Sequence, residues 1–370
     1  MLGSIRMRWS VVGADIGLVV IGSGRIGSLR ARLASAHPSV RFLAVTDRDE
    51  SVARKLAETV SADMWSSDNA VAVAHPDVNA VVVSTSEGQH IEPVLQALEL
   101  GKTVLVEKPI ALDLDEADCI VAAADASSGG LHVGYSRRFR RRYHNAKEQI
   151  VQGRMGRLLG GAARVYNSRS QAVAMLTRNP KATPVVDALT YYVDLMHWFF
   201  EGRQLAEVSA IGQRGVLEAA GFPTDDLTWA ILRYDDGAVI NLGVSYALPD
   251  KYPARGHAAR VELIGTDGVM LLDDDHTDQV MYTEHGVPHV YLPDDPVNVV
   301  FLSSGTPGDW ALGEFIGPLA TETRAWIDHV VTGRPCNLAT PAEARATLEA
   351  TLAIERSAAA GHPVALQRDS

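Results

Sequence analysis

The stretch Ile16-Gly-Leu-Val-Val-Ile-Gly22-Ser-Gly24-Arg-Ile-Gly27 decides the fold of this chain. Its first six residues are apolar and mostly β-branched, which predicts a strand buried on both faces. A helical pattern begins directly after the glycines. A Gly-x-Gly-x-x-Gly triplet in such a strand-to-helix turn is typical of folds that bind a dinucleotide.

Each glycine of this triplet has a physical task in that interpretation. Gly22 permits the tight turn, Gly24 lets the backbone approach the pyrophosphate, and Gly27 lets the helix pack closely on the strand. The helix that follows starts near Arg25 and Ile26, and its free N–H groups and partial positive charge suit phosphates. The alternative is a glycine-rich turn that holds no ligand.

The pattern around this turn continues as strands that alternate with helices up to about residue 135. Strands are predicted at 16–21, 41–46, near Met64, and at 79–84, 103–106 and 131–135. Helices are predicted at 26–36, 51–60, 90–100 and 113–126. This alternation favours right-handed βαβ units and an α/β fold with a doubly wound parallel sheet, the Rossmann architecture.

The pattern then changes to long strands that follow one another directly. They are predicted at 157–167, 205–214, 227–234, 238–247, 259–264 and 268–273, with helices at 139–152, 184–200, 318–332 and 341–359. Asp-Gly turns at Gly237 and Gly268 are hairpin signals. We therefore expect a C-terminal α+β domain with a large, mostly antiparallel sheet.

Three segments are expected from these patterns. Residues 1–14 form an N-terminal extension, 15–137 an NAD(P)-binding domain, and 138–370 a domain that binds the substrate and forms oligomers. The extension lacks a convincing signal-peptide cleavage site, and no run approaches the roughly 18 apolar residues of a membrane span. We expect a cytoplasmic protein that does not bind membranes.

The net charge and the cysteine content argue against several other classes of protein. The formal net charge is -11, and no basic tract is long enough for a nucleic-acid groove. The densest basic run, Arg137–Arg142, is interpreted as the solvated start of a helix, with phosphate binding as the alternative. Cys119 and Cys336 are interpreted as buried, inert thiols. Neither a disulfide framework nor a metal site is expected.

Asp47 closes the second predicted strand, twenty positions after Gly27. A carboxylate at this position can accept hydrogen bonds from the adenosine ribose hydroxyls and would repel a 2′-phosphate, which favours NAD. Arg48 follows it and could pair with a 2′-phosphate or stack on adenine, so NADP stays possible.

A more specific signal is Val104-Leu-Val-Glu107-Lys108-Pro109, a strand that ends in Glu-Lys-Pro. Behind a Gly-x-Gly-x-x-Gly fold, it resembles the glucose–fructose oxidoreductase / inositol dehydrogenase (Gfo/Idh/MocA) family. Ser84-Thr85 and His90 match the family's segment before the helix that leads to Glu-Lys-Pro, and the segment from Gly134 to Phe139 resembles its crossover between domains. The resemblance covers about residues 15 to 365.

The resemblance implies roles for these residues. The cofactor would contact Ser84, Thr85, His90, Glu107 and Lys108. Lys108 would also be catalytic or orient the substrate, Tyr135 would contact the substrate, and a cis bond often precedes the proline. The alternative for Glu107-Lys108 is a salt-bridged pair at a strand end.

The second catalytic segment is expected on the helix that contains Asp187, Tyr191 and Asp194. Their spacing of i, i+4 and i+7 puts them on one face of an α-helix. The family commonly has histidine where this chain has Tyr191, although sugar-oxidoreducing and dihydrodiol dehydrogenase-like members resemble it in having tyrosine. We expect Tyr191 as the acid/base, with Lys108 or His197 as alternatives for the proton relay.

The expected reaction is a reversible hydride transfer between NAD and a secondary alcohol of a sugar, a cyclitol or a related polyhydroxylated ring. Lys108 polarises the reacting oxygen, Asp187 orients Tyr191 or the substrate, and Asp194 and Arg164 add substrate contacts. Three alternatives remain: an NADP-linked ketosugar reductase or dihydrodiol dehydrogenase, a regulator without turnover, and a lyase or hydrolase with a tightly bound cofactor. The long sheet predicts a homodimer or homotetramer.

Overall fold

The computed structural model describes residues 15–179, 182–249, 258–273, 280–288, 294, 296–301, 309–311 and 314–366. The expected N-terminal extension lies outside them. By their contacts, the described residues form two compact units. The first contains those within 1–107, 122–132 and 322–337, and the second contains those within 108–121, 133–321 and 338–370.

The parallel doubly wound sheet predicted for the N-terminal part is confirmed. Its six strands are ordered β3-β2-β1-β4-β5-β6, so the order reverses next to β1, which pairs in parallel with both β2 and β4. Ligands of doubly wound sheets bind at such a switch point, outside the carboxyl ends of the strands. The strands are β1 (Ile16–Ile21), β2 (Val40–Thr46), β3 (Met64–Ser66), β4 (Ala80–Val83), β5 (Thr103–Glu107) and β6 (Leu131–Gly134).

The helices that connect these strands also lie close to their predicted positions. All six residues of β1 are buried, as expected for a central parallel strand. The short helix α3 and the 3₁₀ turn η1 were not predicted, because each is too short to show a helical period. The elements are α1 (Arg25–Ser35), α2 (Glu50–Val60), α3 (Asn69–Val73), η1 (Glu87–Gln89), α4 (Ile91–Glu99) and α5 (Leu114–Ala126).

The second unit is built on a nine-stranded sheet, and the prediction of a large, mostly antiparallel sheet is confirmed. Its order is β14-β13-β12-β11-β7-β10-β9-β8-β17, and β7 with β10 is a parallel pair. The strands are β7 (Leu158–Ser168), β8 (Leu205–Gln213), β9 (Leu227–Tyr234), β10 (Val239–Leu248), β11 (Ala258–Gly265), β12 (Gly268–Asp273), β13 (Val280–Val287), β14 (Val297–Phe301) and β17 (Val364–Ala365). A separate two-stranded sheet pairs β15 (Asp309–Ala311) with β16 (Glu314–Ile316).

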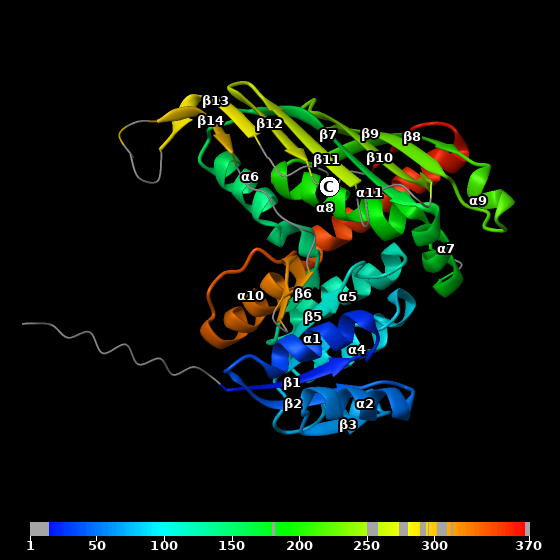
Figure 1. The fold of residues 1–370 in the computed structure, drawn as a ribbon, viewed down its shortest axis with the longest axis vertical. Helices are drawn as coiled ribbons and strands as arrows, with labels where there is room; N and C mark the ends of the chain where they lie inside the picture. Colours follow the sequence, from blue (N-terminus) through cyan, green and yellow to red (C-terminus); the bar gives the residue numbers. More distant parts are fainter. Residues whose placement is uncertain are drawn as a thin grey trace, which may run out of the picture. The chain divides into compact units, whose positions relative to one another are not determined.

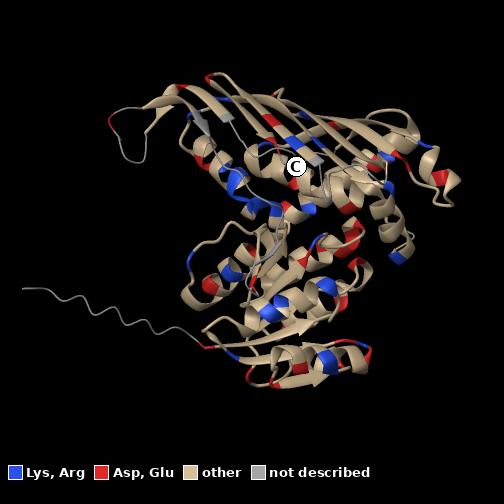
Figure 2. Ribbon diagram, viewed as in Figure 1, with Lys and Arg blue, Asp and Glu red and all other residues tan. Residues whose placement is uncertain are grey.

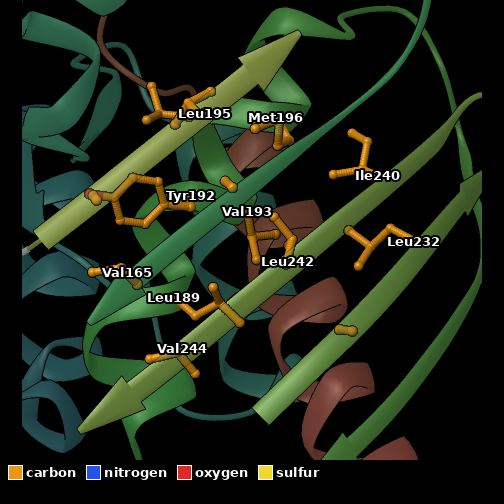
Figure 3. Packing of buried hydrophobic residues seen from close by; sticks show 14 of the residues in the cluster. Val165, Leu189, Tyr192, Val193, Leu195, Met196, Leu232, Ile240, Leu242 and Val244 are labelled. Carbon is orange, nitrogen blue, oxygen red and sulfur yellow. The ribbon is translucent and has the colours of Figure 1, made fainter. Parts of the chain in front are cut away.

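Helices cover one face of the large sheet and leave the other face open (Figure 1). Alternate residues of β9 are buried, which is the pattern of a strand with one covered face. The core between helix and sheet is apolar: Val193 and Met196 face Ile240 and Leu242 (Figure 3). The helical elements are η2 (Ser136–Phe139), α6 (Arg141–Val151), α7 (Arg169–Arg178), η3 (Val185–Leu189), α8 (Thr190–Phe199), α9 (Val216–Ala219), α10 (Pro318–Thr332) and α11 (Pro341–Ala360).

Two expectations about exposed and buried side chains are wrong. Figure 2 shows the basic run at the start of α6, but Arg137, Arg138, Arg140 and Arg142 are buried and do not form a solvated face. Arg138 explains part of this, because it pairs with the buried carboxylate of Asp194. Cys119 and Cys336 were both expected to be buried, but Cys119 is exposed on α5 and Cys336 is only partly buried. Among the described helices, none has the length and apolar character needed to cross a membrane.

Candidate functional site

The glycine turn has the geometry that a dinucleotide site requires. Gly22 has a φ of +91°, and a Cβ on it would lie 2.7 Å from the carbonyl oxygen of Ser84. A Cβ on Gly27 would lie 1.7 Å from the carbonyl oxygen of Gly22, so only glycine lets α1 approach the turn. A Cβ on Gly24 would meet no described atom within 4 Å, which leaves space at the helix N-terminus. Arg25 and Ile26 form the first turn of that helix.

Nothing within the described chain caps α1. Its N-cap, Gly24, offers no side-chain acceptor, and the first turn contains no acidic residue. The helix therefore keeps free N–H groups at the point where a pyrophosphate would bind. This arrangement fits a dinucleotide.

Asp47 is tied directly to the glycine turn. Its Oδ2 accepts a hydrogen bond from the backbone N–H of Ser23 at 2.9 Å, and its Oδ1 accepts one from the N–H of Asp49 at 3.0 Å. These bonds hold the carboxylate at the end of β2. The neighbouring Arg48 side chain is exposed.

Ser84, Thr85 and His90 follow β4 along one short loop. The Ser84 hydroxyl oxygen is buried and has no hydrogen-bond partner within the described residues, so a bound ligand can supply one. His90 is buried, and its Nε2 lies 3.3 Å from the carbonyl oxygen of Thr85. His90 thus supports the loop from inside.

Glu107 does not pair with Lys108, so the interpretation of a salt-bridged Glu107-Lys108 pair is wrong. Glu107 accepts hydrogen bonds from Nε and an NH₂ group of Arg30, at 2.9 and 2.8 Å. Arg30 is fully buried and also pairs with Glu322 at 2.5 Å. Burial alone lowers the pKa of the Arg30 guanidinium, but the carboxylates of Glu107 and Glu322 outweigh this and raise it.

Lys108 lies instead against the turn that contains Asp187. Its Nζ donates to the carbonyl oxygen of Asp187 at 2.9 Å and lies 3.7 Å from Oδ1 of the same residue. The Lys108–Pro109 bond is cis, as the resemblance implied. The ammonium and the carboxylate thus form a charged pair within the second unit.

Tyr246 and Asn167 complete this network, and Tyr246 was not among the candidates from the sequence. The Tyr246 hydroxyl donates to Oδ2 of Asp187 at 2.5 Å. Burial and the negative charge of Asp187 hold the pKa of Tyr246 well above its usual value, so the hydroxyl stays a donor. Asn167 also hydrogen-bonds Tyr246, while its buried Oδ1 has no partner within the described residues. That oxygen can accept a hydrogen bond from a ligand.

Strand parity could have identified Tyr246. On β10 the residues Ile240, Leu242, Val244 and Tyr246 alternate, and all are buried in the core against the helices. A tyrosine at the last core position needs a partner for its hydroxyl, which points to a polar group nearby. The partner itself cannot be read from the sequence of the strand.

Two cations lie over the ring of Tyr191. Lys108 Nζ and the Arg137 guanidinium each lie 4.9 Å from the centre of its ring. Arg137 is 9% exposed, and its Nε has no hydrogen-bond partner within the described part of the chain. Both contacts have the geometry of cation–π interactions, in which the positive charge is attracted to the face of the ring. The buried basic run therefore contributes to the site, which the expectation of a solvated run had missed.

Asp187, Tyr191 and Asp194 were expected on one face of a single α-helix, but that helix is not continuous. Residues 185–189 form a single π-helical turn, η3, before α8 begins at Thr190. Such turns alter the helical period. Asp194 is fully buried, and its oxygens accept from Nε and an NH₂ group of Arg138 at 2.9 and 2.7 Å.

This pairing gives Asp194 a different role from the expected substrate contact. Both of its oxygens are engaged by Arg138, which also lies 3.4 Å from Glu343. Burial alone lowers the pKa of Arg138, and the charge of Asp194 raises it above its usual value. We assign Asp194 as a structural partner that anchors α8.

Two further substrate candidates point elsewhere. Tyr135 is 1% exposed, its hydroxyl lies 3.5 Å from that of Thr190, and its ring packs edge-on against Tyr191. Tyr135 therefore supports the ring of Tyr191 from the buried side. Arg164 alternates on β7 with the buried Ala163 and Val165, so it lies on the face of the sheet opposite the helices. Its guanidinium stacks on Tyr166 at 4.8 Å.

His197, an alternative proton relay, packs edge-on against Tyr234. Burial and the charge of Arg138 lower its pKa to about 4. The imidazole is therefore neutral near pH 7. It does not take up a proton in the range where the reaction is expected to run.

The chain was compared with known protein families and proteins. Residues 16–135 match an oxidoreductase family with an NAD-binding Rossmann fold (GFO_IDH_MocA), and residues 143–271 match the GFO/IDH/MocA C-terminal domain. The inositol 2-dehydrogenase of Acidothermus cellulolyticus is 30% identical over 258 residues, which span 68% of this chain and 71% of that protein.

Two more relatives agree with these matches. The scyllo-inositol 2-dehydrogenase (NAD(+)) of Bacillus subtilis is 26% identical over 267 residues, covering 68% of this chain and 72% of that protein. The solved structure of GenD2 from gentamicin A biosynthesis, in complex with NAD, is 25% identical with a TM-score of 0.74. It covers 96% of this chain and 97% of that one. The chain therefore belongs to the GFO/IDH/MocA family of NAD-binding oxidoreductases.

Proposed function

We propose that the protein is an NAD-dependent dehydrogenase of a cyclitol, with inositols as the first substrates to test. The observation that carries this is the pair formed by Lys108 and Asp187, because Lys108 directly follows strand β5 of an NAD-binding sheet. Two relatives that match about two thirds of the chain are named as inositol dehydrogenases.

The site offers the donors and acceptors that a polyol needs. Lys108 supplies N–H donors, Asp187 supplies a carboxylate, and Asn167 supplies a buried acceptor. A ring that carries several hydroxyls can add hydrogen bonds to all three, while an apolar substrate would leave the buried oxygen of Asn167 without a partner. This supports a polyhydroxylated substrate over an aromatic one.

The proposed chemistry assigns one task to each residue. Lys108 hydrogen-bonds the reacting hydroxyl and stabilises the negative charge that develops on its oxygen. Tyr191 takes the proton at its phenolic oxygen, and two cations lie over its ring. Asp187, whose carboxylate accepts a hydrogen bond from Tyr246, keeps the ammonium group of Lys108 in position. When bound, NAD accepts the hydride from the substrate carbon.

The cofactor contacts proposed from the sequence are the glycine turn with Arg25 and Ile26, the carboxylate of Asp47 with Arg48, and the loop with Ser84, Thr85 and His90. Glu107 holds the end of β5 through Arg30. We keep 15–137 as the cofactor domain and 138–370 as the substrate domain. We also propose a cytoplasmic enzyme that assembles as a homodimer or homotetramer.

The first test measures NADH formation with a panel of substrates. The purified protein is incubated with NAD⁺ or NADP⁺ and with inositols, sugars and aromatic dihydrodiols. We expect turnover with at least one inositol and NAD⁺. Turnover only with dihydrodiols, or only with NADP⁺ and ketosugars, would favour the corresponding alternative. Absence of turnover with every compound would favour the regulator.

The Lys108→Met variant tests the catalytic assignment. We expect turnover to fall by about 10²- to 10⁴-fold, because the variant loses the positive charge at the reacting oxygen. NAD⁺ affinity, measured by calorimetry, should stay within about twofold. Lys55→Met, on the exposed surface of α2, is the matched control and should behave as the wild type. Full turnover in Lys108→Met would disprove the assignment.

A further inference from the structure

Three side chains that the proposed reaction does not use meet in the first unit. His132 lies on β6, His329 lies in the last turn of α10, and Cys336 lies in the segment that follows this helix. Their potential ligand atoms all lie within 4.8 Å of one another. The sequence showed no metal-binding spacing because His132 is nearly two hundred residues away from the other two.

The distances suit a metal ion. Cys336 Sγ lies 3.8 Å from Nε2 of His132, and the rings of His132 and His329 meet edge to face at 4.9 Å between their centres. In a tetrahedral zinc site, Zn–N bonds of about 2.0 Å and Zn–S bonds of about 2.3 Å put nitrogen and sulfur roughly 3.5 Å apart. Cys336 and His132 would need to approach by only a few tenths of an ångström, and the other pairs of ligand atoms by no more than about 1.5 Å.

A hydrogen bond already orients one of the ligands. Nδ1 of His329 lies 2.6 Å from the carbonyl oxygen of Arg334. A carbonyl only accepts, so Nδ1 must carry the proton, and the lone pair of the neutral ring is on Nε2. Metal-binding histidines usually have such an outer partner. All three side chains are partly buried, so an ion can enter from solvent.

We propose that His132, His329 and Cys336 bind one Zn²⁺ ion, with water as the fourth ligand. Two imidazoles and a thiolate are ligands that zinc prefers, whereas Mg²⁺ and Ca²⁺ prefer oxygen. Binding converts the Cys336 thiol to a thiolate and releases its proton to solvent. The ion links β6 to α10 and to the segment after it, and all three ligand residues belong to the first unit.

Cobalt provides the direct test, because Co²⁺ replaces Zn²⁺ and is visible. Protein stripped with a chelator is titrated with Co²⁺ and then with Zn²⁺. We expect a thiolate-to-cobalt charge-transfer band and the visible bands of tetrahedral Co²⁺, both lost when Zn²⁺ is added. Absence of the charge-transfer band in the wild type would overturn the proposal.

Three variants identify the ligands. Cys336→Ser should abolish the band and weaken Zn²⁺ binding by at least about 100-fold, since loss of an outer partner alone costs 10- to 100-fold. His329→Asn should weaken binding similarly while its amide still donates to Arg334. Cys119→Ser, at the exposed cysteine of α5, is the matched control and should bind as the wild type. Equal affinity in Cys336→Ser and Cys119→Ser would refute the site.

Two readouts keep the test independent of catalysis and of folding defects in the variants. Saturating Zn²⁺ should raise the melting temperature of the wild type and of Cys119→Ser by about 5 °C. It should not raise that of His329→Asn. In the wild type, Zn²⁺ should also protect Cys336 from alkylation, mapped by mass spectrometry, while Cys119 reacts with or without the metal. Alkylation of Cys336 at an unchanged rate would contradict the proposal.

Discussion

Asp187 makes contacts through three different atoms, and each contact has a distinct effect. Its backbone carbonyl and Oδ1 face Lys108, while Oδ2 accepts from Tyr246. A carboxylate held from two sides loses rotational freedom before a substrate arrives, which lowers the entropic cost of aligning the ammonium. Tyr246 is thus a positioning residue, because it acts on the ammonium through Asp187.

We predict that Tyr246→Phe lowers kcat by roughly tenfold to a hundredfold, because a hydrogen bond to a charged group contributes about 1.5–3 kcal/mol. The KM for NAD⁺ should not change. The measurement is steady-state kinetics with the inositol that the substrate panel identifies.

Tyr234→Phe is the matched control for this prediction. Tyr234 is equally buried in the same sheet, but its hydroxyl has no partner within the described residues. Its removal should leave kcat unchanged. An equal loss in both variants would mean that Tyr246 only stabilises the fold.

At the cofactor turn, we predict that Asp47→Asn raises the kcat/KM ratio of NADP⁺ to NAD⁺ by about tenfold. The amide oxygen can still accept from the N–H of Ser23, but the negative charge that repels a 2′-phosphate is lost. Such a factor corresponds to about 1.4 kcal/mol. Kinetics with both cofactors measure the ratio.

Arg48→Ala distinguishes the two interpretations of the neighbouring arginine. In the Asp47→Asn background, it should reverse the gain with NADP⁺ if Arg48 pairs with the 2′-phosphate. If Arg48 stacks on adenine, both cofactors should weaken together. An unchanged ratio in Asp47→Asn would show that the carboxylate does not select the cofactor.

Individual residues were predictable where backbone geometry alone decides their role. The roles of Gly22 and Gly27 were predicted from turn geometry. The role of Lys108 was predicted from the resemblance of the motif Glu107-Lys108-Pro109 to the family. Asp194, Tyr135 and Arg164 were placed less well, because their surroundings depend on contacts distant in sequence. Arg138 is 56 positions from Asp194, and no local pattern reveals that pair.

The π-helical turn of η3 shows how an element can depart from its sequence pattern. An α-helix repeats every 3.6 residues, and one wider turn shifts every later side chain around the axis. The chain therefore directs Asp187 to Lys108 while α8 buries Tyr192, Val193 and Asp194. The sequence predicts a helix here, but it does not contain a local signal for the extra residue in the turn.

The partly buried His197 on α8 makes the stability of the fold depend on pH. Its pKa is near 6.5 in the unfolded chain and about 4 in the fold. Between these values the unfolded state binds a proton that the folded state does not, so stability falls as pH falls below about 6.5. We predict a loss of about 2 kcal/mol between pH 7 and pH 5 from this group.

The measurement compares urea unfolding of the wild type and His197→Gln at both pH values. Glutamine does not titrate. The variant should therefore lose about 2 kcal/mol less stability than the wild type between pH 7 and pH 5. Tryptophan fluorescence follows the transition through Trp198, beside the substituted residue. The same pH dependence in both proteins would assign the effect to other groups.

Other elements were predicted well because their apolar residues recur with a clear strand or helix period. Strands β9 and β12 and helix α10 agree residue for residue with the expectation. The helix α7 was missed, although Ser168 and Gln171 form a capping box at its start. It follows β7 without an intervening loop, so the pattern of the strand conceals its beginning.

At the scale of the whole molecule, the large sheet of the second unit has one face covered by helices and one open (Figure 1). The open face is unusually apolar: Ile211 is 76% exposed, and Ile231 and Trp229 are 42% and 38% exposed. The strand pairing puts Ile211 opposite Trp229 on neighbouring strands. Contiguous apolar surface of this kind marks an interface in a folded protein.

The fold class was predictable from the order and length of the strands in the sequence. The oligomeric state depends instead on the surface that the folded chain exposes. In the sequence of β9, the residues that point to one face of the sheet are mostly apolar, and those that point to the other face are partly apolar. This pattern did not indicate whether a second layer of the same chain covers the open face. The helices α6, α8 and α11 all pack on the other side, and no helix within the described residues covers this face (Figure 1).

We predict that the open face joins copies of this chain, and that the double variant Ile211→Glu with Ile231→Glu separates them. Four carboxylates would be buried in an isologous dimer interface, and each would lack a partner. Light scattering after size-exclusion chromatography should show twice or four times the monomer mass for the wild type and one monomer for the variant. The double variant Val71→Glu with Val151→Glu adds the same charge at exposed valines on the helices α3 and α6, outside the open face of the sheet, and should keep the wild-type mass. A monomeric wild type, or an assembled Ile211→Glu/Ile231→Glu variant, would show that the sheet face is not the interface.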